Sequence, residues 1–411
     1  MEWEDCIKGD CPLLCSDAGR HYDEALLLRF SAAAALAYLS YAMCRAPVLP
    51  LYARELGATP QTIGLVVGAS TLAGILLKLP AGAISDAVGR RAVLLGAGAV
   101  FALLPFIYPL VSSIALLMTV RFVHGSGTAL FGPTASATLS DLAPADERGR
   151  WLGTYSAIQG TGQAAGPVLA GWLLGSFGFV VPFITAGILG GCAWLLVAMV
   201  SPGPRKTEPM KLSALRHAIG DVAGDRRIIW TSIAQSSQFL LHGLIAAFLP
   251  LYAVEHVGLN APEAGLIFGI QMVTTILSRP VFGRLSDRIG RRPMIAVGLT
   301  GSGLAVASLS IADSFPELLA VSALYGAGLA VTTSSTAALI TDLTHRSRYG
   351  AAHGLFGTIF DVGDAIGPIA GGIMVAGIGY ARTFQAAGSL VVGLAALFWI
   401  ASRNWTVSTN R

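Results

Sequence analysis

The chain has 411 residues, of which 54% are hydrophobic and only 12% are charged, with a net charge of +4. Its mean hydropathy is +0.66. Soluble proteins carry about 25% charged residues, so this composition excludes a soluble multidomain protein, a disulfide-rich secreted scaffold, a nucleic-acid binder and a disordered chain. The chain is therefore predicted to be a membrane protein that crosses the bilayer many times.

Twelve apolar segments follow one another, each close to the roughly 20 residues that a bilayer-spanning helix needs. They cover 30–52, 62–82, 92–110, 114–136, 151–175 and 180–200, and then 229–253, 264–283, 293–312, 316–340, 350–376 and 380–401. This pattern predicts an all-α membrane protein with twelve transmembrane helices in two six-helix bundles. The predicted parts are an N-terminal tail (1–26), a first bundle (27–200), a linker (201–228), a second bundle (229–402) and a C-terminal tail (403–411).

Basic residues are distributed unequally between alternate loops. If the N-terminus lies inside, the inner loops carry sixteen of them: Arg90, Arg91, Arg148, Arg150, Arg205, Lys206, Lys211, Arg216, Arg226, Arg227, Arg284, Arg288, Arg291, Arg292, Arg346 and Arg348. The outer loops carry only Arg54 and Arg382. Because loops rich in Lys and Arg stay on the cytoplasmic side, both termini are predicted to be cytoplasmic.

The two halves repeat each other at an offset of 201 residues. GAISDAVGRR at 82–91 aligns with GRLSDRIGRR at 283–292. Other residues keep the same offset: Asp141 and Asp342, Gly162 and Gly363, Gly166 and Gly367, Pro167 and Pro368, and Gly171 and Gly372. Such a parallel repeat is typical of a transporter whose binding site lies between the halves.

Several motifs coincide with these repeats. The loop motif G-x-L-x-D-x-x-G-R-R appears as Gly82, Asp86, Gly89, Arg90 and Arg91, with Ile84 at the leucine position, and again as Gly283, Asp287, Gly290, Arg291 and Arg292. Span four carries L-x-x-x-R-x-x-Q-G as Leu117, Arg121 and Gly125, with His124 in place of the glutamine. Span five carries G-x-x-x-G-P-x-x-G-G as Gly162, Gly166, Pro167 and Gly171, with Ala170 at one glycine position. Span one ends in P-V-L-P at 47–50. Over residues 27–402 the sequence thus resembles the major facilitator superfamily, and within it the twelve-span drug:proton antiporters.

The resemblance implies a gate at the inner loops, formed by Gly82, Asp86, Arg90, Asp141, Gly283, Asp287, Arg291 and Asp342. It also implies that Arg90 pairs with Asp141 and Arg291 with Asp342. The carboxylates sit at helix ends, where they can contact the positive N-terminal dipole of a neighbouring helix. A simpler interpretation is that the arginines only anchor the loops on the inner side.

The resemblance also assigns a hinge to the antiporter motif and its repeat, comprising Gly162, Gly166, Pro167, Gly171, Gly363, Gly367, Pro368 and Gly372. The glycines fall at a spacing that lets two helix backbones approach closely. Pro167 removes one helical hydrogen bond and so bends its helix. Ordinary helix packing explains the same residues equally well.

Charges without a counterpart in the other half are candidates for the transport chemistry. Asp361 and Asp364 correspond to Gly160 and Gln163, and they lie three residues apart on one helix, hence on nearly the same face. Two close carboxylates in a medium of low dielectric cannot both ionise cheaply, so one is expected to hold a proton, as a proton carrier must. The alternative is a static pair with Arg45 or Arg121.

The bases separate into a shared and an unshared group. Lys78 and Arg279 keep the offset of 201 near inner helix ends, and are interpreted as scaffold residues whose long stems reach the interface. No basic counterpart in the other half exists for Arg45, Arg121 or His124. Arg121 and His124 are one turn apart on span four, which lines the cavity in the family that the sequence resembles. His124 is either a titrating group or a hydrogen-bonded core residue.

The expected function is proton-coupled efflux of a small organic compound across the cell membrane by a monomer, with protons, the compound and the lipid bilayer as partners. One alternative is an exchanger or importer of a small anionic solute held by Arg45 and Arg121. Metalloid export through Cys6, Cys11 and Cys15, or a membrane sensor that has lost transport, are further alternatives. No catalytic constellation stands out, so neither an enzyme, a cofactor nor a resident metal is expected.

Overall fold

The computed structural model describes residues 12–144, 147–200, 220, 224–344 and 349–405. The side chains of residues 12–23, 79, 82, 83, 86 and 349–351 lie outside that description. Within it every regular element is helical. Most of the predicted linker 201–228 falls outside the described residues, and its last three residues already belong to the helix that begins at Arg226.

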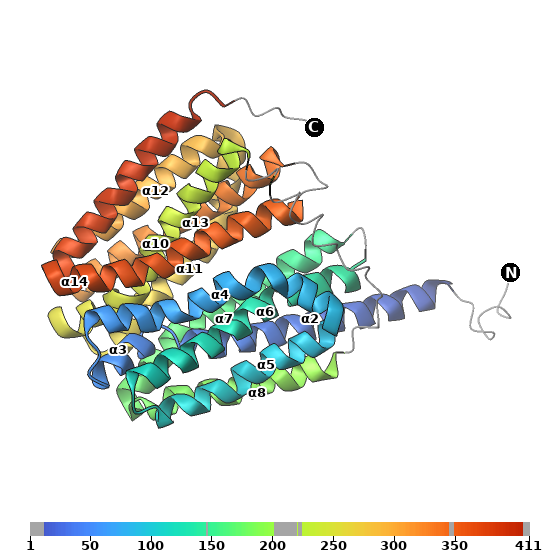
Figure 1. Cartoon of the computed structure of the whole chain (residues 1–411). Helices are drawn as coiled ribbons and strands as arrows, with labels where there is room; N and C mark the ends of the chain where they lie inside the picture. The colour runs from blue at the N-terminus through green and yellow to red at the C-terminus, as the bar shows by residue number, and fades with distance from the viewer. Residues whose placement is uncertain (1–11, 145–146, 201–219, 221–223, 345–348, 406–411) are drawn as a thin grey trace.

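The first half contains six long helices and one short one (Figure 1). They are α2 (Pro12–Met43), α3 (Val48–Glu55), α4 (Pro60–Val88), α5 (Arg90–Ile107), α6 (Ile114–Leu142), α7 (Arg148–Phe177) and α8 (Val180–Met199). The second half contains α10 (Arg226–Leu251), α11 (Ala261–Ile289), α12 (Arg291–Ser308), α13 (Phe315–Leu343) and α14 (Tyr349–Ser402). Two short 3-10 helices, η1 (Tyr108–Leu110) and η3 (Leu309–Ile311), follow α5 and α12, and a short π-helix, η2 (Tyr252–His256), follows α10.

Ten of the described helices are long and apolar enough to cross a membrane. One of them, α14, is interrupted by non-helical backbone at Gly379 and therefore holds two spans. The 30-residue α7 is not among the ten because its sequence is more polar. Counting α7 and both arms of α14 is consistent with the twelve predicted spans.

The predicted first span, 30–52, is not a continuous helix. The chain leaves helical geometry after Met43 and resumes it at Val48, so that Arg45 lies in a break between α2 and α3. Pro47 lacks a backbone N–H and disfavours helical geometry at the residue before it, which accounts for the break.

The repeated loop motif ends α4 and α11 in the same way. Gly89 has φ +96° and Gly290 has φ +108°. Both glycines occupy the left-handed region that side chains disfavour, and each amide N–H bonds back to a carbonyl four residues earlier, at Ser85 and Ser286. The motif therefore stops each helix and starts the next within one residue.

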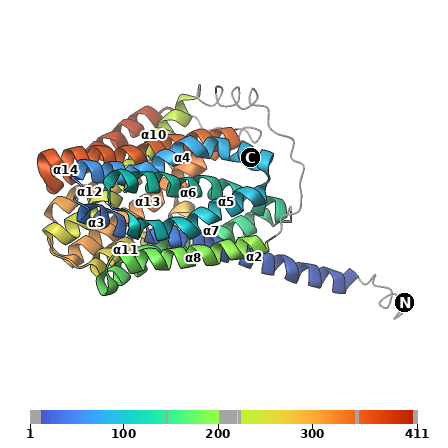
Figure 2. The same ribbon diagram turned by 60° about the horizontal axis from the view of Figure 1, so that its bottom comes forward.

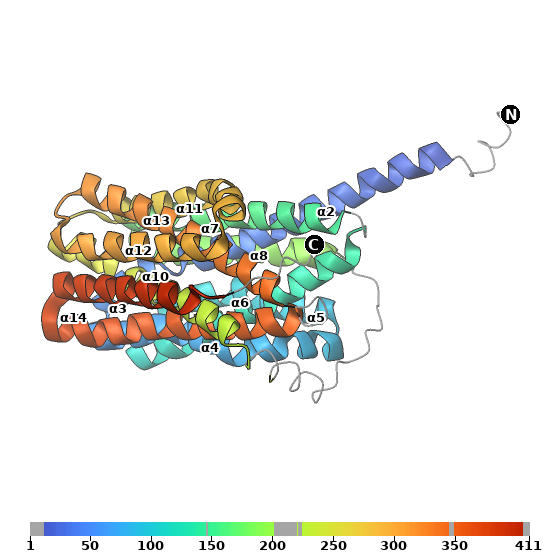
Figure 3. The same cartoon turned by 90° about the horizontal axis from the view of Figure 1, so that it is seen from above.

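The helices pack as two groups, one from each half: the second half lies above the first in Figure 1 and in front of it in Figure 3. The α4 and α14 helices lie next to each other where the two groups meet (Figure 2). The start of α2 and the end of α14 lie at one end of the bundle, which we call the termini end. Contacts there include Arg150 with Glu24 and Arg91 with the carbonyl of Ala198. The other end, which carries the turns after α3, α7 and α10, is called the opposite end.

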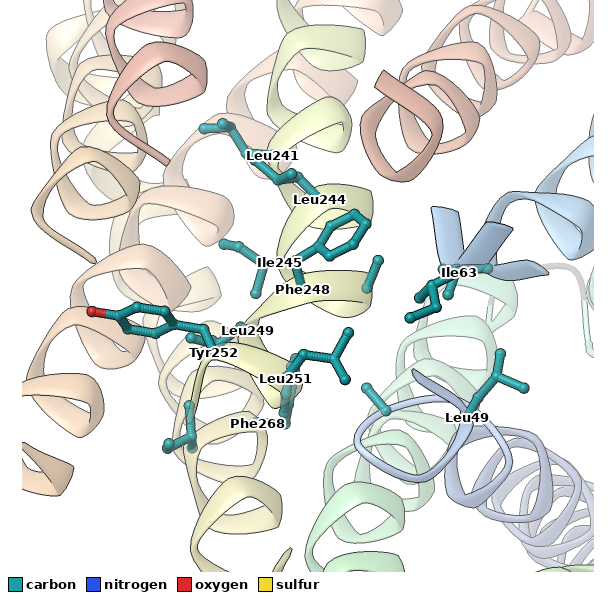
Figure 4. Packing of buried hydrophobic residues seen from close by; sticks show 14 of the residues in the cluster. Leu49, Ile63, Leu241, Leu244, Ile245, Phe248, Leu249, Leu251, Tyr252 and Phe268 are labelled. Carbon is teal, nitrogen blue, oxygen red and sulfur yellow. The ribbon is translucent and has the colours of Figure 1, made fainter. Parts of the chain in front are cut away.

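The largest apolar cluster joins the two halves near the opposite end. Leu49 and Ile63 of the first half face Leu244 and Phe248 of the second, and all four are buried (Figure 4). In a bilayer, lipid tails are as apolar as these side chains, so close packing rather than exclusion of water stabilises such a contact. The two halves are thus held together most tightly at this end.

Candidate functional site

A cavity of about 370 Å³ lies between the two halves. Its wall is made by α2 and the break after it, and by α4, α6, α7, α10, α11, α13 and α14. Sites of a few hundred cubic ångströms suit small molecules. The charged residues in the wall are Arg45, Lys78, Arg279, Asp361 and Asp364, with His242 beside them.

Asp364 is the most heavily bonded of these groups. Arg45 Nη2 lies 3.3 Å from its Oδ2, and Thr71 Oγ1 donates to the same oxygen at 3.0 Å. His242 Nδ1 lies 2.8 Å from Oδ1. An ionised carboxylate can only accept, so Nδ1 carries the proton of the imidazole. Three donors from both halves therefore converge on one carboxylate.

Asp361 has a simpler environment one turn away on α14. Lys78 Nζ lies 2.6 Å from Oδ2 and donates to Oδ1 at 2.8 Å. The ammonium also lies 5.2 Å from the centre of the Phe360 ring. Asp361 is almost buried, with its side chain 5% exposed, whereas Lys78 is 35% exposed to the cavity. A buried carboxylate of this kind depends on its cation.

The two carboxylates therefore face the same cavity, as their spacing predicts, and each has its own cation instead of sharing one. The internal pair of Arg45 with Asp364, one of the alternatives left open by the sequence, is present. Both ion pairs join the halves, because the cations come from the first half and the acids from the second.

Lys78 was wrongly interpreted as an interfacial scaffold residue. It lies ten residues before the end of α4 at Val88, and its ammonium bonds Asp361 within the cavity. Arg279, its counterpart, also lines the cavity. The sequence gives no signal that marks His242 or Thr71 as cavity residues, since a lone polar residue on an apolar helix has no distinguishing pattern.

Arg121 and His124 do not line the cavity, contrary to the expectation for span four. Both are fully buried inside the first half. Arg121 donates to Ser70 Oγ at 2.8 Å, to Tyr108 Oη at 3.3 Å and to the carbonyl of Cys44 at 3.4 Å. No described carboxylate pairs with it; the Cys44 carbonyl and the C-terminal dipole of α2 provide negative partial charge instead.

His124 completes this buried network. Its Nδ1 lies 3.0 Å from Tyr108 Oη, and its ring packs edge-on to Tyr41. The Arg121 guanidinium lies 5.5 Å from the centre of that same tyrosine ring. The network fixes the break after α2, and with it the position of Arg45. This geometry matches the second interpretation of His124, a hydrogen-bonded core residue.

The predicted ion pairs of the gate are present at the termini end. Arg90 Nε lies 3.0 Å from Asp141 Oδ2, and Arg291 Nε lies 3.1 Å from Asp342 Oδ2. Arg291 also pairs with Asp287. Each pair lies within one half and so does not join the halves. The side chains of Gly82 and Asp86 lie outside the described residues, and a Cβ placed on Gly283 would meet no atom within 4 Å.

The predicted hinge residues are packing points in both halves. A Cβ at Gly162 would lie 2.1 Å from the Ala35 carbonyl oxygen, and one at Gly363 would lie 2.1 Å from that of Ser236. Gly166 and Gly367 are equally crowded, against Ala42 and the Leu240 carbonyl. These four glycines hold α7 against α2 and α14 against α10.

The last glycine of each motif contacts the other half. A Cβ at Gly171 would lie 2.6 Å from the Ala261 carbonyl oxygen of α11, and one at Gly372 would lie 2.4 Å from the Pro60 carbonyl oxygen of α4. Their neighbours Pro167 and Pro368 place carbonyl oxygens 2.5 and 2.2 Å from the corresponding positions at Gly265 and Gly64. We call these four glycines (64, 171, 265 and 372) the glycine seam. The seam closes the opposite end of the cavity.

An ion pair that the sequence analysis missed lies beside the seam. Arg54 Nε is 2.7 Å from Glu255 Oε1, and Tyr380 Oη donates to the other oxygen at 3.1 Å. Arg54 and Glu255 have opposite charges and follow the LPLYA segments that recur at 49–53 and 249–253, Arg54 directly and Glu255 one residue further on. Residues related in this way can meet at the axis between the halves, and this signal could have identified them.

Comparison with known proteins agrees with this architecture. The sequence profile described as Major Facilitator Superfamily matches residues 30–260 and 231–408. An uncharacterized MFS-type transporter of Methanocaldococcus jannaschii is 27% identical over 85% of this chain and 92% of its own. The multidrug resistance protein MdtG of Salmonella paratyphi C is 26% identical over 86% and 89% of the two chains.

Solved structures give the same result at the level of the fold. A bacterial homologue of the human lysosomal transporter Spinster, in an inward-facing and unoccupied conformation, superposes with a TM-score of 0.76 at 16% identity, covering 93% of this chain and 97% of that one. A D-xylose–proton symporter superposes with a TM-score of 0.75 at 17% identity, covering 91% and 96%.

Proposed function

The chain belongs to the Major Facilitator Superfamily, and from this premise we propose that it is a proton-coupled exporter of a small organic compound. In this proposal it works by alternating access: the cavity opens to one side of the membrane at a time while the two halves rock about it. The similarity to MdtG supports export, although the identity is only 26%.

The observation that carries the proposal is the pair of ion pairs between the halves. Lys78 with Asp361 and Arg45 with Asp364 join α4 and the α2–α3 break to α14 across the cavity. A proton that neutralises either carboxylate removes the electrostatic attraction across that contact. Protonation at this site therefore changes how strongly the two halves hold each other, which is what coupling requires.

We place the described conformation after release of the proton. The termini end is cytoplasmic in this proposal, because the basic loops lie there. With the seam closed at the opposite end, the cavity then faces inward, and both carboxylates are engaged by cations instead of protons. The cavity is ready to take up the compound, and the next proton reaches Asp361 or Asp364 once it faces outward.

The test is transport in proteoliposomes with an imposed proton gradient. Ethidium and carboxyfluorescein serve as fluorescent cargoes of opposite charge, and each is also followed in counterflow without a gradient. Asp361→Asn and Asp364→Asn should each reduce gradient-driven transport at least tenfold while counterflow continues. The matched control Glu147→Gln removes an exposed carboxylate that pairs with Arg150, and should transport like the unmodified protein. Unchanged gradient-driven rates in both cavity variants would show that the proton binds elsewhere.

The alternatives receive less support from the geometry. A clamp for anions made of Arg45 and Arg121 requires both in the cavity, whereas Arg45 is engaged by Asp364 and Arg121 is buried behind the wall. Metalloid export depends on Cys6, Cys11 and Cys15, whose side chains lie outside the described residues. The cell membrane as location and a monomer as the working unit remain part of the proposal.

A further inference from the structure

The third base of the cavity has no partner in the part of the chain that the structure describes. Arg279 of α11 lines the cavity and is exposed to it, yet makes no hydrogen bond or ion pair with any other described residue. The other two bases, Arg45 and Lys78, are each neutralised by a carboxylate. The described wall therefore has three basic side chains against two acidic ones, and the uncompensated charge belongs to Arg279.

The repeat shows at which position a partner for Arg279 would be expected. Lys78 is equivalent to Arg279, so the residue equivalent to Asp361 should face Arg279, and that residue is Gly160 of α7. Gly160 does face α11, because a Cβ placed on it would lie 3.6 Å from Ile276, one turn from Arg279. The first half thus presents a glycine at the place where the second half presents an acid.

A guanidinium at bilayer depth needs water or an anion beside it. Its planar fork of donors matches carboxylate, sulfonate and phosphonate groups in a bidentate way, and such charge-assisted hydrogen bonds are the stronger kind. An anionic group on the transported compound would supply the charge that the first half lacks.

The remainder of the wall suits an apolar, flat molecule. Phe239 and Phe360 lie in contact, with ring centres 4.5 Å apart, and Phe268 and Met272 line the same cavity. Gln163, at the position equivalent to Asp364, offers an amide without charge. These surfaces can hold an aromatic body while Arg279 holds its charged group.

We propose that the cavity binds small organic anions with an aromatic body, and that Arg279 binds their acidic group. The inference rests on the proposed transport function only for its choice of cavity, because binding can be measured without a proton gradient. In this inference the anionic group is bound by Arg279 alone, and not by the clamp of Arg45 and Arg121.

The experiment uses the full-length protein in nanodiscs and three pairs of probes: benzoate and benzamide, 1-naphthoate and 1-naphthamide, and 9-anthroate and its amide. Each pair differs essentially in charge. Competition for a bound radiolabelled member of the panel gives the affinities. At least one carboxylate is expected to bind tenfold or more tightly than its amide. Arg279→Gln should abolish that preference, and Arg279→Lys should retain part of it.

A second variant supplies the missing acid. Gly160→Asp should pair with Arg279 and lower carboxylate affinity at least tenfold, with amide affinity little changed. Gly153→Asp, two turns away on the same face of α7, is the matched control, because a Cβ there meets no atom within 4 Å. It should preserve the preference.

Two results would overturn the inference: no preference for the carboxylate in any pair, or a preference that survives in both Arg279→Gln and Gly160→Asp. Failure of the proposed function would give a different result: if transport is not coupled to protons, the preference for carboxylates in the binding measurement would still be observed. Proton-driven transport of uncharged compounds, with no preference for anions, would refute only the role of Arg279.

Discussion

The glycine seam makes a quantitative prediction about conformation. A methyl group at Gly64 would lie 2.2 Å from the Pro368 carbonyl oxygen, and one at Gly265 would lie 2.5 Å from that of Pro167. Ordinary van der Waals contacts begin near 3.4 Å. Since the obstructing atoms are backbone, the opposite end must open by about 1 Å to admit the methyl group.

The energetic cost falls on one conformation only. Overpacking of a close contact costs about 1–3 kcal/mol. The seam joins the two halves, so this cost applies when the opposite end is closed and disappears when it opens. Gly64→Ala or Gly265→Ala should therefore shift the population away from the described conformation by a factor of about 5 to 150. The gain in helix propensity from glycine to alanine is common to both conformations and cancels.

Distances between spin labels measure this shift. Val88 and Ile289 are exposed, lie at the termini end and occupy equivalent positions in the two halves. Cysteines at these positions, in a chain without its native cysteines, would carry the labels in nanodiscs. The seam variants should enlarge the population with the shorter distance, because the termini end closes as the opposite end opens.

The matched control is Gly96→Ala, where a Cβ meets no atom within 4 Å. It should leave the distance distribution unchanged. If Gly64→Ala and Gly265→Ala give the same distribution as the control, the seam does not determine which end is closed, and the argument from close backbone contact is wrong.

Two further predictions concern single side chains. Arg54→Ala removes the ion pair with Glu255, in which the arginine side chain is 50% exposed. Exposed ion pairs contribute about 0.2–1 kcal/mol, so the same spin labels should report a population shift of only about 1.4- to 5-fold. A larger shift than in the seam variants would contradict this ranking. Arg121→Met leaves the Cys44 carbonyl and nearby hydroxyls without their donor, and should lower the stability by about 1–3 kcal/mol in denaturation measurements. Arg382→Met, at an exposed position, should change stability by less than about 0.5 kcal/mol, and equal effects of the two would refute the role of the buried network.

The sequence was sufficient for the fold class. The thickness of a bilayer imposes apolar stretches of about 20 residues, so composition and segment length alone predict a helical membrane protein. The repeat at 201 residues predicts the two bundles. The resemblance to the family also predicted local contacts: the ion pairs of Arg90 with Asp141 and Arg291 with Asp342, each within one half, are present.

The sequence was less informative about the cavity. It identified Asp361, Asp364 and Arg45, because charges on apolar helices are rare and need partners. It misplaced Lys78, whose long stem could reach either the interface or the cavity, and Arg121, whose neighbours come from distant helices. Both errors concern the direction of a long side chain, which is decided by packing between helices.

The sequence by itself determined the membrane class, the duplicated bundle and the rare buried charges, because each depends on properties repeated along the chain: apolar length, periodicity and composition. Only the tertiary structure decided which cation meets which carboxylate, that Arg279 meets none of those described, and that the cavity is closed at the seam. Those features depend on how two rigid halves are oriented about their common axis. Conformations of a transporter that differ in this orientation share one sequence and differ by only a few kcal/mol, so no local pattern specifies which of them is seen.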